Sequence, residues 1–344
     1  MVVRRQLFIV TVILLGMFVS VGSMASAQDE ATCEAVVQQS LSNLATNCAN
    51  LARGTTCQGN WSIASYAFDD EELEDDYGNP GDTLPLENTL MVQTGSTNLE
   101  EGIELNVMHV DADVPPESDQ GVVFVQFGGV EVENDVTQED IDERGLTPMQ
   151  NFYFRTGLAD NPCPEEAPSL LFVQGPANGI ANLGIYDQPV ELDNATIILR
   201  SFDTDGDDLP ETLELIVLSG LVTLYPDSAS PILVAPGFSV TLQLGPEILS
   251  LGIQGDADEK SVIGQFSTPQ PLTADELEDL IIVEDLPDNV INFPVDVPGI
   301  ITPSGLGGTI SVLDFPPGSP QLAEAAAACA AGQLPEETCE FLGL

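Results

Sequence analysis

A run of acidic residues between two apolar segments has the spacing of a calcium-binding loop. Residues 203–214 read DTDGDDLPETLE, and Asp203, Asp205 and Asp207 fall at positions 1, 3 and 5 of such a loop. Glu214 falls at position 12, where a bidentate carboxylate closes a loop of the EF-hand type. Because hard cations bind dense oxygen shells, calcium is the candidate ion, and its predicted ligands are Asp203, Asp205, Asp207 and Glu214.

Other features of the same run favour an acidic, solvated turn between two strands. Position 6 of a calcium loop needs Gly for a sharp turn, but Asp208 stands there and Gly206 is displaced to position 4. The flanking residues 195–202 and 213–218 have strand character rather than helix character, and Pro210 stiffens the loop. Both interpretations, a calcium site and a plain turn, stay open.

Catalytic motifs are largely absent from the sequence. It has no Gly-x-Ser-x-Gly, no His-Glu-x-x-His and no phosphate-binding glycine loop followed by Lys. The one histidine, His109, ends an apolar stripe in strand period, which is typical of a hydrogen-bonded core residue. A glycosidase-type carboxylate pair is the remaining enzymatic route, but 56 acids contain close pairs by abundance alone. We therefore expect no enzyme.

The first 27 residues have the pattern of a secretory signal. Arg4 and Arg5 precede an apolar run over residues 7–21, and Ala25-Ser26-Ala27 is a small-residue cleavage site. The mature chain would keep 5 basic residues against 56 acids, a formal charge of −51. Because such charge repels nucleic acid and anionic lipid, we expect a secreted or cell-envelope monomer that does not bind nucleic acid. We also expect no membrane insertion after signal cleavage.

Six cysteines follow the signal, and an even number in an exported chain predicts three disulfides. They are Cys33, Cys48, Cys57, Cys163, Cys329 and Cys339. The first two lie on one amphipathic helix but ~22 Å apart, too far for a bridge. Cys48 can meet Cys57 after the helix ends at Gly54, and Cys329 can meet Cys339 across the turn at Pro335. Elimination then pairs Cys33 with Cys163.

Short strands separated by turn residues dominate the middle of the chain. The clearest stretch has apolar segments at 213–218, 221–225, 232–234 and 238–244, with the first break at Ser219-Gly220. Segments that are apolar throughout are typical of strands covered on both faces. The predicted fold class is mainly β, an antiparallel sandwich or barrel with short N- and C-terminal helices.

Part of this strand-rich region resembles the FecR-type domain. The resemblance rests on Ser169–Pro176, Ala195–Arg200, Leu215–Val222 with Ser219-Gly220, and Val234-Ala235-Pro236-Gly237 before Val240. It implies an all-β extracytoplasmic module over residues 169–244. FecR regulators also keep an N-terminal segment in the cytoplasm for a sigma factor, whereas only a few residues precede the apolar run of this signal. The resemblance therefore does not imply signalling. The flanks are similar to acidic exported proteins of Chloroflexota-type bacteria, a group without an assigned activity.

We expect six regions along the chain. They are a signal peptide (1–27), a Cys-bearing helix (28–58), a first β region (59–160), a FecR-like β region (161–248), a Pro/Gly-rich extended segment with a short helix opened by the capping box of Thr273 and Glu276 (249–320), and a C-terminal Cys-bearing helix (321–344). The extended segment is expected to pack over the sheet.

The predicted function is non-enzymatic. We expect an exported cell-envelope or extracellular β-domain protein with a binding or structural role, calcium as a candidate ligand, and an unidentified protein or envelope polymer as partner. The alternative is a secreted carbohydrate-active enzyme that uses a carboxylate pair.

The mature protein should begin at Gln28 and contain no free thiol. Intact-mass measurement before and after reduction tests both expectations, because each disulfide adds two hydrogens on reduction. More than one alkylated cysteine in the unreduced, denatured protein would contradict three disulfides.

Overall fold

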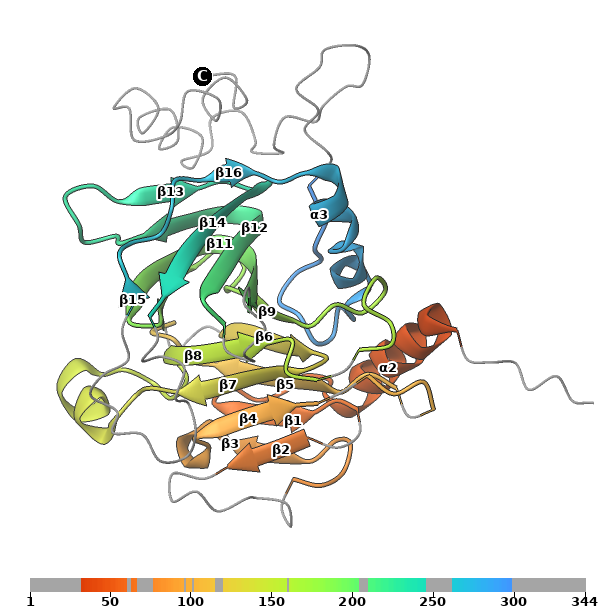
Figure 1. The fold of residues 1–344 in the computed structure, drawn as a ribbon. Coiled ribbons are helices and arrows are strands. Elements are labelled where there is room, and N and C mark those ends of the chain that lie inside the picture. The colour runs from red at the N-terminus through yellow and green to blue at the C-terminus, as the bar shows by residue number, and fades with distance from the viewer. Residues whose placement is uncertain are drawn as a thin grey trace, which may run out of the picture. The chain divides into compact units, whose positions relative to one another are not determined.

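The structure is a computed structural model that describes residues 32–60, 63–66, 77–95, 97–100, 102–114, 120–159, 161–203, 210–245 and 262–298 (Figure 1). Its strands form one 16-stranded sheet, so the predicted mainly-β fold class is confirmed. The predicted signal peptide, the C-terminal helix with Cys329 and Cys339, and the loop residues Asp205 and Asp207 lie outside the described residues.

The elements are short except for two long strands in the middle of the sheet. The first eight strands are β1 (Thr55–Gln58), β2 (Ile63–Tyr66), β3 (Thr83–Pro85), β4 (Met91–Thr94), β5 (Leu105–Val110), β6 (Val122–Phe127), β7 (Val130–Asn134) and β8 (Asn151–Thr156). The others are β9 (Leu170–Gln174), β10 (Ile180–Ile185), β11 (Gln188–Phe202), β12 (Thr212–Leu224), β13 (Ile232–Val234), β14 (Phe238–Leu244), β15 (Val262–Ile263) and β16 (Gln270–Pro271). The helices are α2 (Cys33–Asn47) and α3 (Ala274–Glu278), with 3-10 turns η1 (Leu86–Asn88) and η5 (Ile281–Asp285) and a π-helical turn η2 (Asp140–Arg144).

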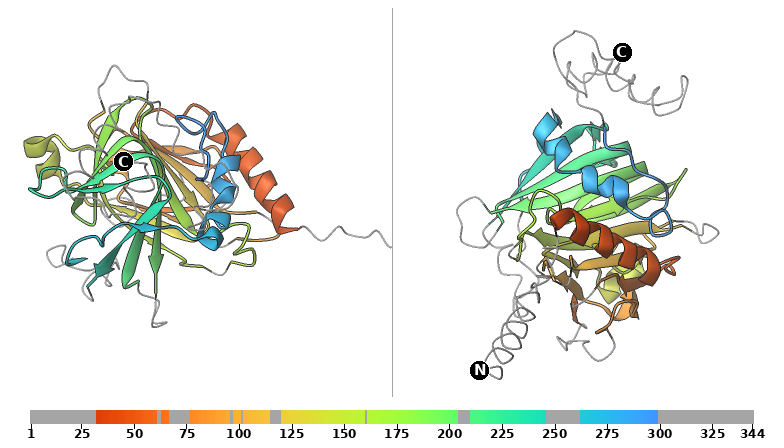
Figure 2. Two further views of the ribbon diagram at one scale, coloured as in Figure 1. Left: turned by 90° about the horizontal axis from the view of Figure 1, so that it is seen from above. Right: turned by 90° about the vertical axis from the view of Figure 1, so that its right-hand side faces the viewer.

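The sheet is almost entirely antiparallel. Its main path is β2-β4-β7-β8-β10-β11-β9-β6-β5-β1-β3, while β12 pairs with β11, β13 and β14. Among the described strands only β8 and β10 pair in parallel, with Asn151 opposite Gly184 and Phe152 opposite Ile185. The sheet curls on itself (Figure 2), as the right-handed twist of many adjacent strands favours.

The predicted break at Ser219-Gly220 is wrong, because β12 runs through it. The pairing of β11 with β12 shifts register there, so Ser219 lies opposite Thr196 and Leu221 opposite Asp193. Gly220 has φ +72°, and a Cβ on it would lie 2.2 Å from the carbonyl oxygen of Asn194. The glycine therefore permits a bulge and a close backbone approach rather than a turn. Residues 195–202, which have predicted strand character, form the second half of β11.

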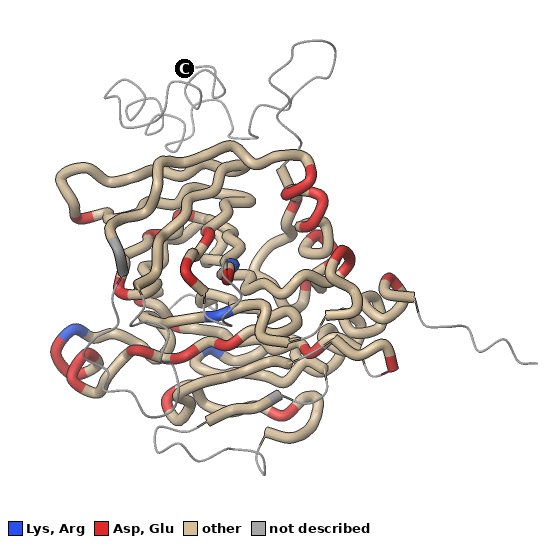
Figure 3. The backbone as a smooth tube through the Cα atoms, viewed as in Figure 1, with Lys and Arg blue, Asp and Glu red and all other residues tan. Residues whose placement is uncertain are grey.

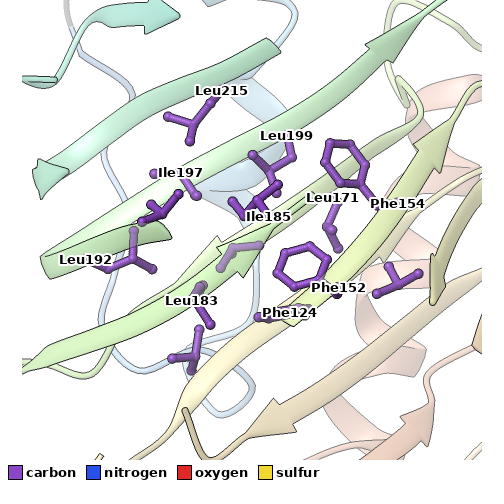
Figure 4. Packing of buried hydrophobic residues seen from close by; sticks show 14 of the residues in the cluster. Phe124, Phe152, Phe154, Leu171, Leu183, Ile185, Leu192, Ile197, Leu199 and Leu215 are labelled. Atoms are coloured by element: carbon purple, nitrogen blue, oxygen red, sulfur yellow. The ribbon is translucent and has the colours of Figure 1, made fainter. Parts of the chain in front are cut away.

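Two hydrophobic cores lie on the two faces of the sheet. The inner core, inside the curl, takes Phe124 of β6, Leu171 of β9 and Ile197 of β11 (Figure 4). The outer core takes the next residue of each strand, Val125, Phe172 and Ile198. Because successive side chains of a strand point to opposite faces, these strands bury apolar groups on both sides, as their composition predicted.

Helix α2 and the segment that carries α3 cover the outer core, and both lie on the same side of the sheet (Figure 2). α2 contributes Val37, Leu41 and Leu44, and the later segment contributes Leu280 and Val283. The predicted capping box is confirmed, since Thr273 and Glu276 exchange side-chain and backbone hydrogen bonds at the start of α3. The described part of the Pro/Gly-rich segment therefore packs over the sheet.

Two of the three predicted disulfides are confirmed. Cys33 and Cys163 have Cα atoms 5.6 Å apart, and Cys48 and Cys57 have Cα atoms 5.8 Å apart. α2 ends at Asn47, earlier than the predicted end, because Asn50 already has φ 54° as the chain reverses towards Cys57. The longer bridge ties the start of α2 to the loop before β9. No cysteine among the described residues is free.

Glu104 is a carboxyl group buried just before β5. It is 7% exposed, and its Oε2 accepts a hydrogen bond from the backbone N–H of Gly95. A Cβ on Gly95 would lie 2.9 Å from Glu104 Oε1, so the glycine leaves room for the carboxyl. Burial raises the pKa of Glu104 from 4.5 to about 7, and the hydrogen bond from Gly95 opposes the shift.

We expect Glu104→Gln to have a higher free energy of unfolding than wild type. This difference should grow between pH 4.5 and pH 7 and stay constant above pH 7. Between pH 4.5 and pH 7 the folded wild type keeps the proton of Glu104, whereas the unfolded chain has lost it. The stability of the wild type therefore falls as pH rises through this range, by at most about 3 kcal/mol. Gln keeps an acceptor for Gly95. Urea unfolding at pH 5 and pH 8 measures the difference, with exposed Glu165→Gln as control. A gain equal at both pH values would contradict the burial of a charge.

Candidate functional site

The described residues of the predicted calcium loop lie on the β11–β12 hairpin. Asp203 directly follows β11, and Glu214 lies within β12 opposite Arg200. Asp203 lies three positions after Arg200, which is about 10 Å of extended chain. Glu214 would therefore have to leave its present neighbours to close an ion-binding loop at the hairpin tip. Calcium binding by Asp203, Asp205, Asp207 and Glu214 stays a prediction.

Arg200 and Glu214 form a partly buried charged pair under the edge of α3. Their strand neighbours Leu199 and Leu213 belong to the inner core, so both charged side chains point to the outer face. Burial raises the pKa of Glu214, opposed by a hydrogen bond with Ser239 and by the charge of Arg200. Arg200 Nε and Nη2 are buried and have no hydrogen-bond partner, which is a costly arrangement for a guanidinium.

His109 is a structural residue, as its sequence position predicted. Its Nδ1 lies 2.9 Å from the carbonyl oxygen of Leu51, and its Nε2 accepts the backbone N–H of Gly121 at 2.7 Å. Because Nε2 accepts, Nδ1 carries the proton and donates to Leu51. Burial lowers the pKa of His109 and keeps the ring neutral. Both ring nitrogens are engaged within the protein, so neither is placed to transfer a proton to a ligand.

Two aspartates converge where β8 and β10 meet. Asn151 Nδ2 donates to Asp135 Oδ2 at 2.9 Å and to Asp187 Oδ1 at 2.8 Å. Tyr153 donates its hydroxyl to Asp187 Oδ2 at 2.9 Å and also hydrogen-bonds Asp135. We call these four residues the paired-aspartate cluster. It contains two carboxylates that share two neutral donors.

Three chain segments position the paired-aspartate cluster. Asp135 follows the last residue of β7, while Asn151 and Tyr153 lie two residues apart on β8 and so share one face. Asp187 sits in the two-residue turn between β10 and β11, where Tyr186 and Asp187 have φ 51° and 59°, as in a hairpin turn of type I′. The cluster therefore links β7, β8 and the β10–β11 hairpin at the one parallel junction of the described sheet.

The electrostatics of the cluster favour hydrogen bonding by the phenol. Burial first, and then the charges of Asp135 and Asp187, raise the pKa of Tyr153, so its hydroxyl stays protonated and donates. Asp187 is exposed and Asp135 is half-buried, so the carboxylates face solvent while Tyr153 is only 3% exposed. No group of three or more His, Cys, Asp or Glu side chains in metal-binding geometry occurs within the described ranges.

Sequence reasoning missed the paired-aspartate cluster. Asp135 and Asp187 belong to different predicted regions, and no local motif links them. A turn of type I′ is usually signalled by Asn-Gly or Asp-Gly, whereas Tyr186-Asp187 carries neither. The parallel pairing of β8 with β10 is what brings the two carboxylates together, and that pairing is not encoded in strand periodicity.

Comparisons with known proteins give no family assignment. No family model and no curated protein matches the sequence. Two crystal structures of a candidate anti-sigma factor from Parabacteroides distasonis ATCC 8503 are similar to part of it, with 9% and 8% identity and TM-scores of 0.27 and 0.26. Each covers 53% of this chain, which spans only 59% and 60% of the two matched chains. The FecR-type assignment stays a resemblance, and similarity at this level carries no function.

Proposed function

We propose that the protein is an exported β-domain protein of the cell envelope or extracellular space that acts by binding, not catalysis. The observation that carries the proposal is its uncompensated negative charge. The chain has 56 Asp and Glu residues against 7 Lys and Arg residues. Acidic residues recur along the described backbone, while basic ones are few (Figure 3).

Three of the four described arginines form ion pairs with carboxylates. Arg53 pairs with Asp111 at 2.6 Å, Arg155 with Glu131 at 2.6 Å and Arg144 with Asp140 at 3.0 Å, while Arg200 lies beside Glu214. Lys260 lies outside the described residues. The remaining surface acids therefore have few internal cations to neutralise them.

A surface of this kind favours cationic ligands. It repels nucleic acid and anionic lipid, and it attracts divalent cations and basic segments of a protein or envelope polymer. The two disulfides support an extracytoplasmic location. Among the described helices, none is long and apolar enough to cross a membrane.

A secreted carbohydrate-active enzyme is the second candidate, and the pairing of Asp135 with Asp187 is the observation that favours it. Glycosidases of the retaining type hold two carboxyl groups close together. In this pair, however, Asn151 and Tyr153 donate hydrogen bonds to both aspartates. A catalytic acid and base would need oxygens directed at a substrate, so the geometry favours a binding or structural role.

Calcium should raise the melting temperature of the wild-type protein, and the double variant Asp203→Asn, Asp205→Asn should lose part of that rise. Binding to the folded state alone adds about 2.7 kcal/mol at 100 times the dissociation constant. Differential scanning calorimetry with calcium and with chelator measures the rise.

The control is the double variant Glu165→Gln, Glu166→Gln, which removes the same charge from two exposed positions. It should keep the full calcium response. Equal responses in both double variants would show that calcium only screens the polyanionic surface, and the hairpin would then be a turn without an ion.

A further inference from the structure

We propose that Asn178 is a self-modifying residue, at which the backbone nitrogen of Gly179 displaces the side-chain amide as ammonia. Water then leaves an aspartyl or isoaspartyl residue at position 178. Asn178-Gly179 is the one Asn-Gly pair in the sequence, and it lies between β9 and β10. The reaction needs only the chain and water, so it is independent of the binding role and of the predicted calcium loop.

The reaction balances without an oxidant or a cofactor. The Gly179 nitrogen forms a bond to Cγ of Asn178, the bond from Cγ to Nδ2 breaks, and the proton of the peptide N–H leaves with ammonia. Water then opens the resulting succinimide ring at one of its two carbonyl carbons. Opening at one carbon restores the normal backbone with an aspartyl side chain. Opening at the other carbon routes the backbone through Cγ and makes it one methylene longer.

The conformation of the turn requires the reactive pair of residues. Asn178 has a left-handed backbone with φ 59°, a conformation that Asn tolerates better than most residues. A Cβ on Gly179 would lie 3.0 Å from Cγ of Pro176, so this position favours glycine. The missing Cβ also leaves the Gly179 nitrogen open to approach. The turn therefore selects the two residue types whose order in the chain lets the ring close readily.

Both reacting groups are accessible. The side chain of Asn178 is exposed, and Gly179 is half-buried. Within the described part of the chain, the amide of Asn178 and the N–H of Gly179 have no hydrogen-bond partner. Asn50 is also exposed and has φ 54°, but Leu51 follows it, and the leucine side chain crowds the attacking nitrogen. Asn50 is therefore the internal reference, a left-handed asparagine that should stay intact.

Asn194 of β11 restrains the turn. Its Oδ1 accepts the N–H of Asn178 at 3.1 Å, and its own N–H donates to the carbonyl oxygen of Gly179 at 3.1 Å. Ring closure requires rotation about the Cα–C bond of Asn178, so that the Gly179 nitrogen reaches Cγ. Because these two hydrogen bonds oppose the rotation, the folded protein reacts through local opening of the turn and more slowly than the unfolded chain.

The modification changes both charge and structure beside the bulge of β11. Either product adds a carboxylate to the turn, and the isoaspartyl product lengthens the backbone between the two groups that Asn194 holds. Asn194 lies in the bulge, where its carbonyl oxygen would be 2.2 Å from a Cβ on Gly220. The isoaspartyl form should therefore melt at a lower temperature than the unmodified protein, because it loses hydrogen bonds between the turn and the bulge.

Peptide mapping by mass spectrometry, after storage of the folded protein in mildly alkaline buffer, tests the proposal. The peptide that contains position 178 should gain the mass of an amide-to-acid exchange and separate into aspartyl and isoaspartyl forms. Asn50 should stay unchanged. Asn178→Gln should abolish the conversion, because the longer side chain would have to close a larger ring. An unmodified position 178, or equal conversion at Asn50, would overturn the proposal.

Asn194→Gly measures the restraint. The variant removes the side-chain acceptor and keeps a residue that adopts the φ of 50° at this position. Position 178 should then convert about fivefold faster than in wild type, the effect of losing one hydrogen bond of ordinary strength. Asn50→Gly removes an exposed left-handed asparagine elsewhere and should leave the rate at position 178 unchanged. Equal rates in wild type and Asn194→Gly would contradict opening of this turn as the route. If Asn194→Gly does not fold, the wild-type mapping decides the proposal.

Discussion

The structure depends on a sheet whose central strands are apolar on both faces. Residues such as Ile197 and Ile198 are adjacent in β11 yet fully buried in different cores. A strand of this kind cannot face water on either side, so the sheet needs two covers. Its own curl encloses the inner core, while α2 and the segment that carries α3 close the outer one. The Cys33–Cys163 disulfide ties the start of α2 to the loop before β9.

Several polar side chains within this sheet are held in short-range hydrogen-bond networks. His109 uses both ring nitrogens to tie Leu51 and Gly121. Arg53, Arg144 and Arg155 form ion pairs with carboxylates. The paired aspartates share the neutral donors Asn151 and Tyr153. Basic residues are too scarce to neutralise the remaining acids, so the folded protein carries a large net negative charge. Cations from outside are the natural complement to such a surface.

Local chemistry explains what the sequence could predict. The capping box at Thr273 and the Cys48–Cys57 bridge involve residues close in the chain, and strand identity follows from apolar runs. Ser219-Gly220 was misjudged because glycine serves turns and bulges alike, and only the register of β12 against Asn194 separates the two. The sequence does not predict the paired aspartates, because the β8–β10 pairing that brings them together depends on tertiary structure and not on a local sequence pattern.

Native-state hydrogen exchange tests most directly whether the two-faced sheet is one cooperative structure. The amides of β6, β9, β11 and β12 should exchange slowest and at one common free energy, equal to that of global unfolding, because each core shares these strands. If β11, β12 and β14 opened at a clearly lower free energy than β5 and β6, the sheet would consist of two separately stable parts. That result would contradict the shared central strands as the constraint on which the fold depends.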